Sequence, residues 1–419
     1  MNNLYSPILV FDHFSNTSPQ KMGSLFVDSL RGEESFSFEY DSSYLKNSVH
    51  IQLDPELDYF EGRQYASVKP NFGIFEDSAP DRWGRTLMDR REQIIAREEG
   101  RKPRKLLGSD YLLGVFDETR MGGLRFSLSD QGPFLANDSF LSVPSWISLR
   151  SLEERARQFE KEDFPHTLSW LDQLLRPGSS LGGARPKANI IDPDGNLWIA
   201  KFPSLHDRVD VGAWEMAAVM LAKLCGINVP EATIENFGSA YGSTFLTKRF
   251  DRAGTRRIHF ASAMTMLEAS DGSSRNYSYL DIADFLLSFG AKPKEDLEEL
   301  WKRIVFSIAI SNTDDHLRNH GFLLDSYGWR LSPAYDLNPE PMGQYLSLAI
   351  SETDSSLNIE LAISNAEFFG ISSSRASAIA ADICRIVDNN WEGLAKGYHV
   401  SRKSIEWMRP AFLASKWRP

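Results

Sequence analysis

The feature that most constrains this chain is a polar run that directly follows an apolar helical pattern. Residues 297–310 repeat apolar side chains at helical spacing, and Ser311–Gly321 then reads SNTDDHLRNHG. Within this run, Asn319 lies five positions after Asp314. Protein kinases use this spacing for an Asp that receives the proton of the acceptor hydroxyl and an Asn that holds Mg²⁺. Asp336 follows two strand-like runs. The order of parts therefore predicts phosphoryl transfer.

These three side chains have distinct predicted roles. Asp314 is the predicted catalytic base, and Asn319 and Asp336 are the predicted Mg²⁺ ligands, because Mg²⁺ takes only one or two protein ligands besides phosphates and water. The alternative is a polar turn in which Asp and Asn side chains cap the end of the preceding helix. That alternative leaves the rest of the polar run unexplained.

Two histidines in the same run suggest a metal site at first sight. His316 and His320 are four positions apart, as in the zinc motif H-E-x-x-H, but Leu317 stands where the motif needs Glu. We therefore interpret the histidines as supports of the loop rather than as zinc ligands.

A glycine-rich turn precedes this region at residues 178–187. Adjacent Gly182 and Gly183 allow backbone amides to approach a phosphate, and Lys187 adds positive charge. A Gly-Gly turn by itself is more often a plain loop. Phosphorylation of Ser180 would place negative charge where nucleotide phosphates would bind.

Lys201 and Glu215 form a second pair of candidates. Lys201 lies in the apolar strand pattern of residues 196–202, and Glu215 lies in the apolar helix pattern of residues 210–225. A buried Lys is costly unless it is paired, and kinases pair such a Lys with a helix Glu. The alternative is a Lys that extends to solvent from a strand end and an ordinary surface Glu. The combination with the Asp314 run favours the kinase interpretation.

The rest of the chain alternates strand and helix patterns. We predict strands at Ser24–Asp28 and Ser35–Tyr40 and a helix within residues 72–99, capped by Asp77 or Ser78 with Pro80 in its first turn. Further helices are predicted at 151–175, 374–390 and 402–415. The motif Pro80–Arg85 is interpreted as structural.

Charge, cysteine content and hydropathy argue against several classes of protein. The net charge of −11 argues against broad nucleic-acid binding, although Arg is dense at 82–91 and 97–105. Cys225 and Cys384 form no C-x-x-C pair, which argues against a disulfide framework or a zinc cage. An apolar run of about 18 residues is lacking, so we expect a cytoplasmic protein without a membrane partner.

Together these motifs resemble those of the HipA family, the serine/threonine-kinase toxins of bacterial toxin–antitoxin modules. The resemblance covers most of the chain and rests on these segments: Phe36–Tyr40, Ala79–Arg85, Ser180–Lys187, Ile199–Pro203, Glu215 with Leu224–Pro230, Lys248–Arg252, Asn312–Phe322 and Ser332–Leu337. Two departures are Arg185-Pro186, where the best-known members have Gln-Glu, and Asp315, where they have Gly.

The resemblance implies a role for each matching residue. Lys201 would contact the ATP phosphates, Asp314 would be the catalytic Asp, and Asn319 and Asp336 would hold Mg²⁺. Ser180 would be the autophosphorylated serine that switches the kinase off. The flexible phosphate loop would be formed by Leu181, Gly182, Gly183, Ala184, Arg185 and Lys187, and the remaining nucleotide-site residues would be Lys248, Arg249, Phe250 and His316. Glu215 and His320 would be structural supports.

The resemblance also implies the architecture. We expect an α+β, two-lobed protein-kinase-like fold. Residues 1–130 would form an N-terminal β-rich subdomain with a helix, and residues 131–255 a kinase-like N-lobe with the glycine-rich loop. Residues 256–419 would form an all-helical C-lobe with the catalytic loop.

The implied function is that of an ATP- and Mg²⁺-dependent serine/threonine kinase toxin. It would phosphorylate a translation component such as an aminoacyl-tRNA synthetase, causing growth arrest and persistence. A helix-turn-helix antitoxin would restrain it, and DNA would be reached only through that antitoxin. Two alternatives remain open: a catalytically idle co-repressor that binds the antitoxin, and a kinase-fold phosphotransferase or AMP-transferase with another acceptor.

Overall fold

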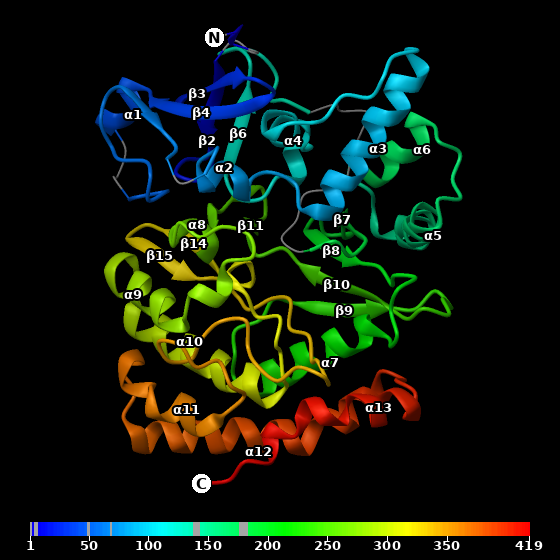
Figure 1. Cartoon of the computed structure of the whole chain (residues 1–419), viewed down its shortest axis with the longest axis vertical. Coiled ribbons are helices and arrows are strands. Elements are labelled where there is room, and N and C mark those ends of the chain that lie inside the picture. The colour runs from blue at the N-terminus through cyan, green and yellow to red at the C-terminus, as the bar shows by residue number, and fades with distance from the viewer. Residues whose placement is uncertain (1, 4–6, 48–50, 68, 137–142, 176–182) are drawn as a thin grey trace. The chain divides into compact units, whose positions relative to one another are not determined.

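The computed structural model describes the whole chain except residues 1, 4–6, 48–50, 68, 137–142 and 176–182 (Figure 1). Its contacts group into two units. The N-terminal unit consists of Met1–Lys201 and Arg249–Ala261, and the C-terminal unit consists of Phe202–Lys248 and Ser262–Pro419. The expected three-part division at residues 130 and 255 stays a prediction.

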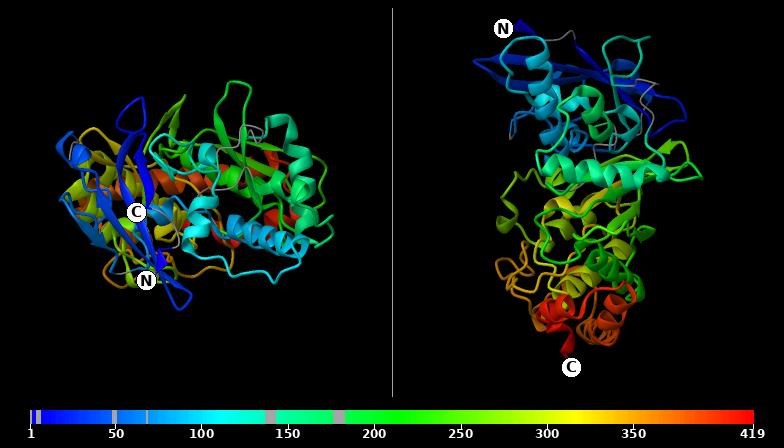
Figure 2. Two further views of the ribbon diagram at one scale, coloured as in Figure 1. Left: turned by 90° about the horizontal axis from the view of Figure 1, so that it is seen from above. Right: turned by 90° about the vertical axis from the view of Figure 1, so that its right-hand side faces the viewer.

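The N-terminal unit is built on an antiparallel sheet with the strand order β5-β4-β3-β2-β6. Its long hairpin, β3 and β4, pairs Leu25 with Phe38 and is visible at the blue end of the chain in both views of Figure 2. Leu25 and Phe38 are fully buried, as strand side chains on a core face should be. The hairpin confirms both strands predicted in this region. The strands span Asn2–Asn3 (β1, on β3), Ile8–Asp12 (β2), Gln20–Leu30 (β3), Glu33–Tyr40 (β4), Arg63–Tyr65 (β5) and Leu124–Ser127 (β6).

Short helices and one long helix follow the hairpin. They are α1 (Ser42–Asn47), α2 (Gly73–Asp77), α3 (Arg82–Glu98) and α4 (Gly108–Gly114). The cap predicted for the long helix was wrong. Asp81 is the N-cap, with an extended backbone and a side chain that accepts the Gly84 N–H at 2.9 Å. The Ser78 hydroxyl instead donates to the Ile74 carbonyl at the end of α2.

The helix expected across residues 151–175 is two helices, α5 (Leu149–Glu160) and α6 (Leu168–Leu175). Glu162 has a left-handed backbone (φ 57°), and Pro165 has no N–H to donate, so the first helix cannot continue. Phe164 stacks on Phe159 and on Trp170, with ring centroids 5.3 and 4.8 Å apart. These aromatic contacts join the two helices across the break.

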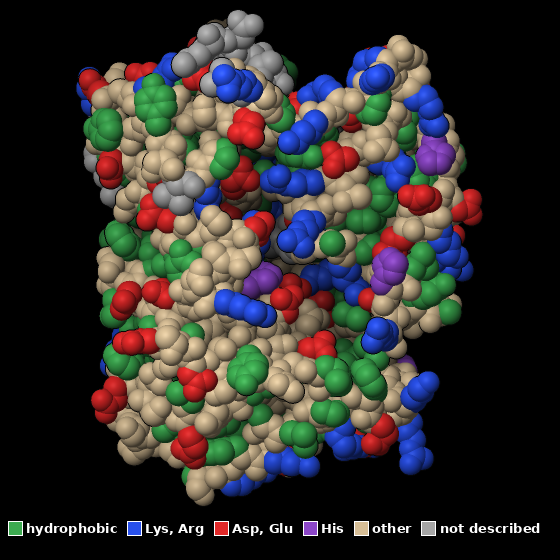
Figure 3. Space-filling view, viewed as in Figure 1, with side chains coloured by type: hydrophobic (Ala, Val, Ile, Leu, Met, Phe, Trp, Pro, Cys, Tyr) green, Lys and Arg blue, Asp and Glu red, His purple; other side chains and the backbone are tan. Residues whose placement is uncertain are grey.

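Basic side chains gather over α3 and the segment that follows it (Figure 3). Most of their charge is compensated locally. Arg91 pairs with Asp172, Arg104 pairs with Asp110, and Arg101 pairs with both Glu92 and Glu99 (the last two at 2.5 Å each). The dense arginines of this region therefore do not form a uniformly positive surface.

The remaining strands of the N-terminal unit are short. β7 (Lys187–Ile191) and β8 (Leu197–Lys201) form an antiparallel hairpin in which Lys187 lies opposite Lys201. β11 (Arg252–Ala253) pairs with β12 (Arg256–Arg257), and β13 spans Phe260–Ser262 at the boundary of the unit.

The C-terminal unit is mainly helical. α12 lies alongside α7 and α10, and Trp391 of α12 stacks on Phe412 with centroids 4.4 Å apart (Figure 1). Trp214 of α7 donates its indole N–H to Ser404 at 3.1 Å. The helices are α7 (Val211–Leu224), α8 (Ala263–Met266), α9 (Tyr279–Phe289), α10 (Pro293–Ala309), α11 (Ile359–Ser364), α12 (Ser373–Gly397) and α13 (Arg402–Met408).

Two hairpins accompany these helices. β9 (Ala232–Glu235) pairs with β10 (Thr244–Lys248), and β14 (Gly321–Asp325) pairs with β15 (Gly328–Leu331). The β14–β15 hairpin lies within the part expected to be all-helical, so that detail was wrong. Apolar residues on these strands, such as Phe322 and Trp329, are fully buried, which explains why the segment pairs as strands.

Candidate functional site

The Asp314 loop begins where α10 ends. Ser311 has a left-handed backbone (φ 50°), which stops the helix, and its hydroxyl donates to the Ala411 carbonyl at 2.8 Å. The Asn312 N–H still bonds back to the Ser307 carbonyl at 2.8 Å. The loop therefore leaves the helix at a fixed point.

Asp315 anchors the loop in the core. Its carboxylate is 4% exposed, accepts from the Tyr279 hydroxyl at 2.6 Å and from the Ser307 hydroxyl at 3.1 Å, and lies 2.9 Å from His320 Nε2. Burial alone would raise the pKa of Asp315, but the charge of His320 and these hydrogen bonds lower it below its usual value. Asp315, which the sequence marked only as a departure from the family pattern, fixes the conformation of its neighbour Asp314.

Asp314 itself is exposed on this anchored loop. Partial desolvation raises its pKa, the charges of Asp336 and Asp315 raise it further, and His316 opposes them. Because the charge of Asp336 raises the pKa of Asp314, the two carboxylates lie close enough to interact electrostatically. An exposed carboxylate with a raised pKa is suited to take up a proton.

Asn319 completes the loop. Its side-chain amide nitrogen donates to the Asp314 carbonyl at 3.0 Å, and its backbone N–H bonds to the His316 carbonyl at 2.8 Å. Because the amide nitrogen is committed to the loop, the amide oxygen is the atom left for a cation. The five residues from Asp314 to Asn319 thus form one compact turn in the structure.

Asp336 has an unusual backbone. Its φ of 59° lies in the left-handed region, which few residues other than glycine adopt, although Asp does so more readily than most. The Asn338 side chain donates to Asp336 Oδ1 at 3.3 Å, and the Asn338 N–H bonds to Asn312 Oδ1 at 3.2 Å. These bonds tie the Asp336 segment to the start of the Asp314 loop.

The donor set fits Mg²⁺ better than zinc. Asn319 and Asp336 offer oxygen ligands, as Mg²⁺ prefers. No group of three or more His, Cys, Asp or Glu side chains is arranged to hold a metal ion in the described ranges. His320 is engaged with Asp315, whereas His316 Nδ1 is buried without a hydrogen-bond partner in the part of the chain that the structure describes. The role of His316 at the nucleotide site stays a prediction.

Other predicted residues of the C-terminal unit are Glu215 and Lys248. Glu215 is only 2% exposed on α7, so the alternative of an ordinary surface Glu was wrong. The Lys248 N–H bonds to the Glu231 carbonyl at 2.8 Å, and its ammonium lies 3.6 Å from the Glu231 carboxylate. The role of Lys248 at the nucleotide site stays a prediction.

The N-terminal unit holds the predicted phosphate-contacting residues. Lys201 is 7% exposed, so the alternative of a solvent-facing Lys was wrong. Lys187 is also buried, and its ammonium contacts Asp81 Oδ2 and the Gly183 carbonyl, each at 2.8 Å. Gly183 and Ala184 are exposed and Arg185 is half-buried. Ser180, Leu181 and Gly182 lie outside the described residues.

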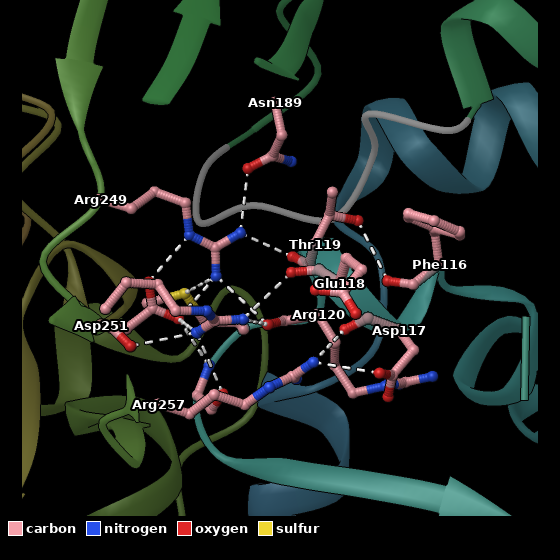
Figure 4. Close-up of polar contacts among 12 residues, drawn as sticks. Phe116, Asp117, Glu118, Thr119, Arg120, Asn189, Arg249, Asp251 and Arg257 are labelled. Atoms are coloured by element: carbon pink, nitrogen blue, oxygen red, sulfur yellow. Dashed lines mark hydrogen bonds and ion pairs between the residues drawn. The ribbon is translucent and has the colours of Figure 1, made fainter. Parts of the chain in front are cut away.

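Arg249 has a role that sequence reasoning missed. Its guanidinium is buried and donates to Asp251 at 2.8 and 2.6 Å, to the Thr119 carbonyl at 2.6 Å and to Asn189 at 2.9 Å (Figure 4). Because these bonds occupy the side chain, the predicted nucleotide contact of Arg249 can involve only its backbone. Phe250, the next residue, is half-buried.

Asp251 is the centre of this buried network. It is completely buried and also accepts from Arg252 at 2.6 Å and from the Gly122 N–H at 2.8 Å. Close by, Asp117 pairs with Arg257 at 3.0 Å (Figure 4). Asp117 also pairs with Arg125. The mixed charges in Lys248-Arg-Phe-Asp-Arg are a sequence signal that is compatible with this network.

Comparison with known proteins adds to this geometry. Residues 179–391, just over half of the chain, match the model of the HipA-like C-terminal domain. The chain belongs to this family. The matched range includes the glycine-rich turn, Lys201 and the whole Asp314 loop, so the resemblance stated from the motifs is confirmed.

Two curated relatives carry the name of kinases. The putative kinase Y4dM of Sinorhizobium fredii is 30% identical over 157 residues, which cover 34% of this chain and 37% of that protein. A putative kinase of Haemophilus influenzae is 27% identical over 179 residues, which cover 38% of this chain and 52% of that protein. The chain thus spans between a third and about half of the curated relatives that it matches. These matches relate part of the chain to two proteins that are named as putative kinases.

A solved structure shows the same fold over nearly the whole chain. HipA of Shewanella oneidensis MR-1, solved in a complex with HipB and its operator DNA, covers 97% of this chain and 95% of its own, with a TM-score of 0.65 and 16% identity. The match confirms the predicted α+β, protein-kinase-like fold. Within the described ranges, no helix combines the length and apolar character needed to cross a bilayer.

A cavity of about 470 Å³ lies elsewhere in the N-terminal unit, between α3, α4 and α6. Arg91, Arg101 and Arg104 line it, but each is paired with a carboxylate, as described above. The balanced charge gives this cavity no preference for a phosphate, and it contains none of the predicted site residues.

Proposed function

We propose that this protein is a serine/threonine protein kinase that transfers the γ-phosphate of ATP with the help of Mg²⁺. The observation that carries the proposal is the arrangement of Asp314, Asn319 and Asp336 on one anchored loop system. Asn319 bonds to the Asp314 backbone, and Asp336 raises the pKa of Asp314.

Each residue has a defined part in the transfer. Asp314 accepts the proton of the acceptor hydroxyl, and its exposed position on the anchored loop leaves its carboxylate accessible to that hydroxyl. Asn319 and Asp336 hold Mg²⁺ through their side-chain oxygens. Bound Mg²⁺ supplies charge that stabilises the phosphoryl group during transfer. Lys201 contacts the ATP phosphates, and the buried Asp315 keeps Asp314 in place.

The proposed setting is a toxin–antitoxin module. The solved HipA structure with the same fold was obtained with HipB and operator DNA, which supports a helix-turn-helix antitoxin as the partner here. In this proposal, DNA is reached only through the antitoxin, and the phosphorylated target is a translation component such as an aminoacyl-tRNA synthetase. Autophosphorylation of Ser180 switches the kinase off.

The proposal is tested with purified protein and ATP labelled at the α- or the γ-phosphate, with Mg²⁺ or with EDTA. We expect incorporation of the γ label only, dependent on Mg²⁺, at Ser or Thr side chains of the protein itself and of a translation extract. Asp314→Asn should reduce the incorporation by at least about 100-fold, the scale of a lost general base. Asp325→Asn, at the exposed end of β14, is the matched control and should retain it.

The other functions give different results in the same assay. Incorporation of the α label would identify an AMP-transferase. Incorporation of neither label, together with full growth arrest by the Asp314→Asn variant in cells, would identify an idle co-repressor and overturn the proposal. Loss of phosphate incorporation upon Ser180→Ala would locate the autophosphorylation, and unchanged incorporation would place it elsewhere.

A further inference from the structure

The motif Pro80–Arg85 in the N-terminal unit has a structural partner that the sequence did not indicate. Asp81 caps α3 through one carboxylate oxygen, which accepts the Gly84 N–H at 2.9 Å. Its other oxygen accepts from the ammonium of Lys187 at 2.8 Å. The two residues are 106 positions apart in the sequence. One carboxylate thus connects the start of a helix to the end of the glycine-rich turn.

Lys187 also contacts the backbone of the glycine-rich turn. Its ammonium also donates to the Gly183 carbonyl at 2.8 Å, four residues earlier. Both partners of the ion pair are buried, with Lys187 3% and Asp81 7% exposed. A buried ammonium is stable only when charged or strongly polar acceptors surround it, so the backbone of residues 183–187 depends on the position of Asp81.

Asp81 lies at a helix start that is held in place by packing and hydrogen bonds. Trp83 in the first turn of α3 is 4% exposed and meets the Phe159 ring edge-on at 5.3 Å. The Arg85 side chain donates to the Pro80 carbonyl at 3.1 Å, which closes the turn before the helix. Gly183 and Ala184, by contrast, are exposed. Packing therefore holds the start of α3 in place, and the conformation of the exposed turn depends on its bond to that start.

We propose that Asp81 is a positioning residue for the phosphate loop: its ion pair with Lys187 holds the Gly183 carbonyl and sets the backbone conformation that receives the nucleotide phosphates. The part concerning nucleotide rests on the proposed function, whereas the part concerning the backbone does not. Lys187 then acts through the loop conformation, with its charge already neutralised by Asp81, rather than as a direct phosphate ligand.

The backbone part is tested by hydrogen–deuterium exchange of the full chain without nucleotide. Asp81→Asn keeps an oxygen that can cap α3 and removes the charge that holds Lys187. We expect amides of residues 183–191 to exchange about tenfold faster, while those of residues 84–98 stay unchanged. Asp130→Asn breaks an exposed ion pair with Lys21 in the same unit and is the matched control, with no expected change at 183–191.

Two further variants keep the test decisive. Lys187→Met removes the ammonium with little change in length and should also speed exchange at 183–191. The double variant leaves no buried charge unpaired, so it folds even if Asp81→Asn alone does not, and its exchange should equal that of Lys187→Met. Unchanged exchange at 183–191 in all three variants, or an equal increase along α3, would overturn the proposal.

The nucleotide part is tested by steady-state kinetics. Asp81→Asn and Lys187→Met should each raise the KM for ATP by about tenfold with kcat within about twofold of wild type, because they disturb binding and not the transfer step. If Lys187 is instead a direct phosphate ligand, Asp81→Asn frees its charge and lowers KM, while Lys187→Met raises it. That split would refute the positioning role. A wild-type protein without ATP turnover would refute the proposed function and leave the exchange result valid.

Discussion

Removal of the Asp251 charge should destabilise the N-terminal unit more than the loss of any ion pair on its surface. The carboxylate is completely buried and receives hydrogen bonds from Arg249, Arg252 and the Gly122 N–H. It thereby attaches the segment Arg249–Ala261 to residues that lie about 130 positions earlier in the chain. Asp251→Asn keeps the size of the side chain and leaves two buried guanidinium groups short of their counter-charge.

The magnitude follows from the burial of the partners. The Arg249 and Arg252 side chains are 1% and 9% exposed, so water cannot replace the lost carboxylate. Removal of one member of a buried ion pair costs about 3–5 kcal/mol of unfolding free energy. For a unit of this size, Met1–Lys201 with Arg249–Ala261, each kcal/mol lowers the Tm by about 2–4 °C, so a decrease of about 6–20 °C is expected.

The assay is scanning calorimetry of wild type and variant, with hydrogen exchange to assign the transition to the N-terminal unit. Asp130→Asn is the control, because its pair with Lys21 is 67% and 32% exposed and should contribute at most about 1 kcal/mol. If Asp251→Asn lowers the Tm no more than Asp130→Asn does, the buried network does not stabilise the unit and our reasoning is wrong.

The same residue predicts a pH dependence. Burial alone would raise the pKa of Asp251, but Arg249 and Arg252 outweigh it and lower the pKa from 3.8 to about 2. A carboxyl with a lowered folded-state pKa stabilises the fold above its unfolded-state pKa and loses this contribution as the pH falls through the folded-state value. The stability difference between wild type and Asp251→Asn should therefore be constant above about pH 4 and shrink from there towards pH 2. A difference that stays constant to pH 2 would contradict this assignment.

Three further predictions concern the C-terminal unit. Tyr279→Phe removes the 2.6 Å bond to buried Asp315 and should cost about 1–3 kcal/mol in urea denaturation, and an unchanged midpoint would argue against the anchor. Asp336→Asn should keep the Tm within about 2 °C, since Asn tolerates the left-handed backbone, yet abolish phosphate transfer; retained transfer would remove Asp336 from the site. Gly343→Ala places a Cβ 2.3 Å from the Thr313 hydroxyl oxygen beside Asp314 and should cost about 1–3 kcal/mol and reduce kcat, whereas Gly393→Ala on α12 meets open space and should be neutral or stabilising.

Local patterns predicted the elements and the centre of the site. Alternating side chains identified the β3 and β4 strands, and helical spacing identified α7 and α10. Asp314 and Asn319 could be recognised because their contact is made within five residues, where sequence spacing nearly fixes geometry. Asp336 could be recognised because a short hairpin separates it from the loop.

Residues that act through distant partners could not be assigned in this way. The anchoring role of Asp315 could not be predicted, because its partners Tyr279 and Ser307 lie on other helical segments. The wrong helix cap arose because Asp77, Ser78 and Asp81 are equally good caps by residue type, and only the course of the chain at Pro80 selects Asp81. The break between α5 and α6 depends on aromatic packing that periodicity does not encode.

The sequence by itself determined the HipA-like family and many of the strands and helices, and it predicted the three residues of the Asp314 loop system, because all of these depend on short-range spacing. Only the tertiary structure decided that Asp315 holds the loop, that Asp81 holds Lys187 and that Arg249 belongs to a buried ion network. The physical reason is that a buried charge is stable only beside its counter-charge. In Asp81–Lys187 and Asp117–Arg257 the chain brings that counter-charge from more than a hundred residues away.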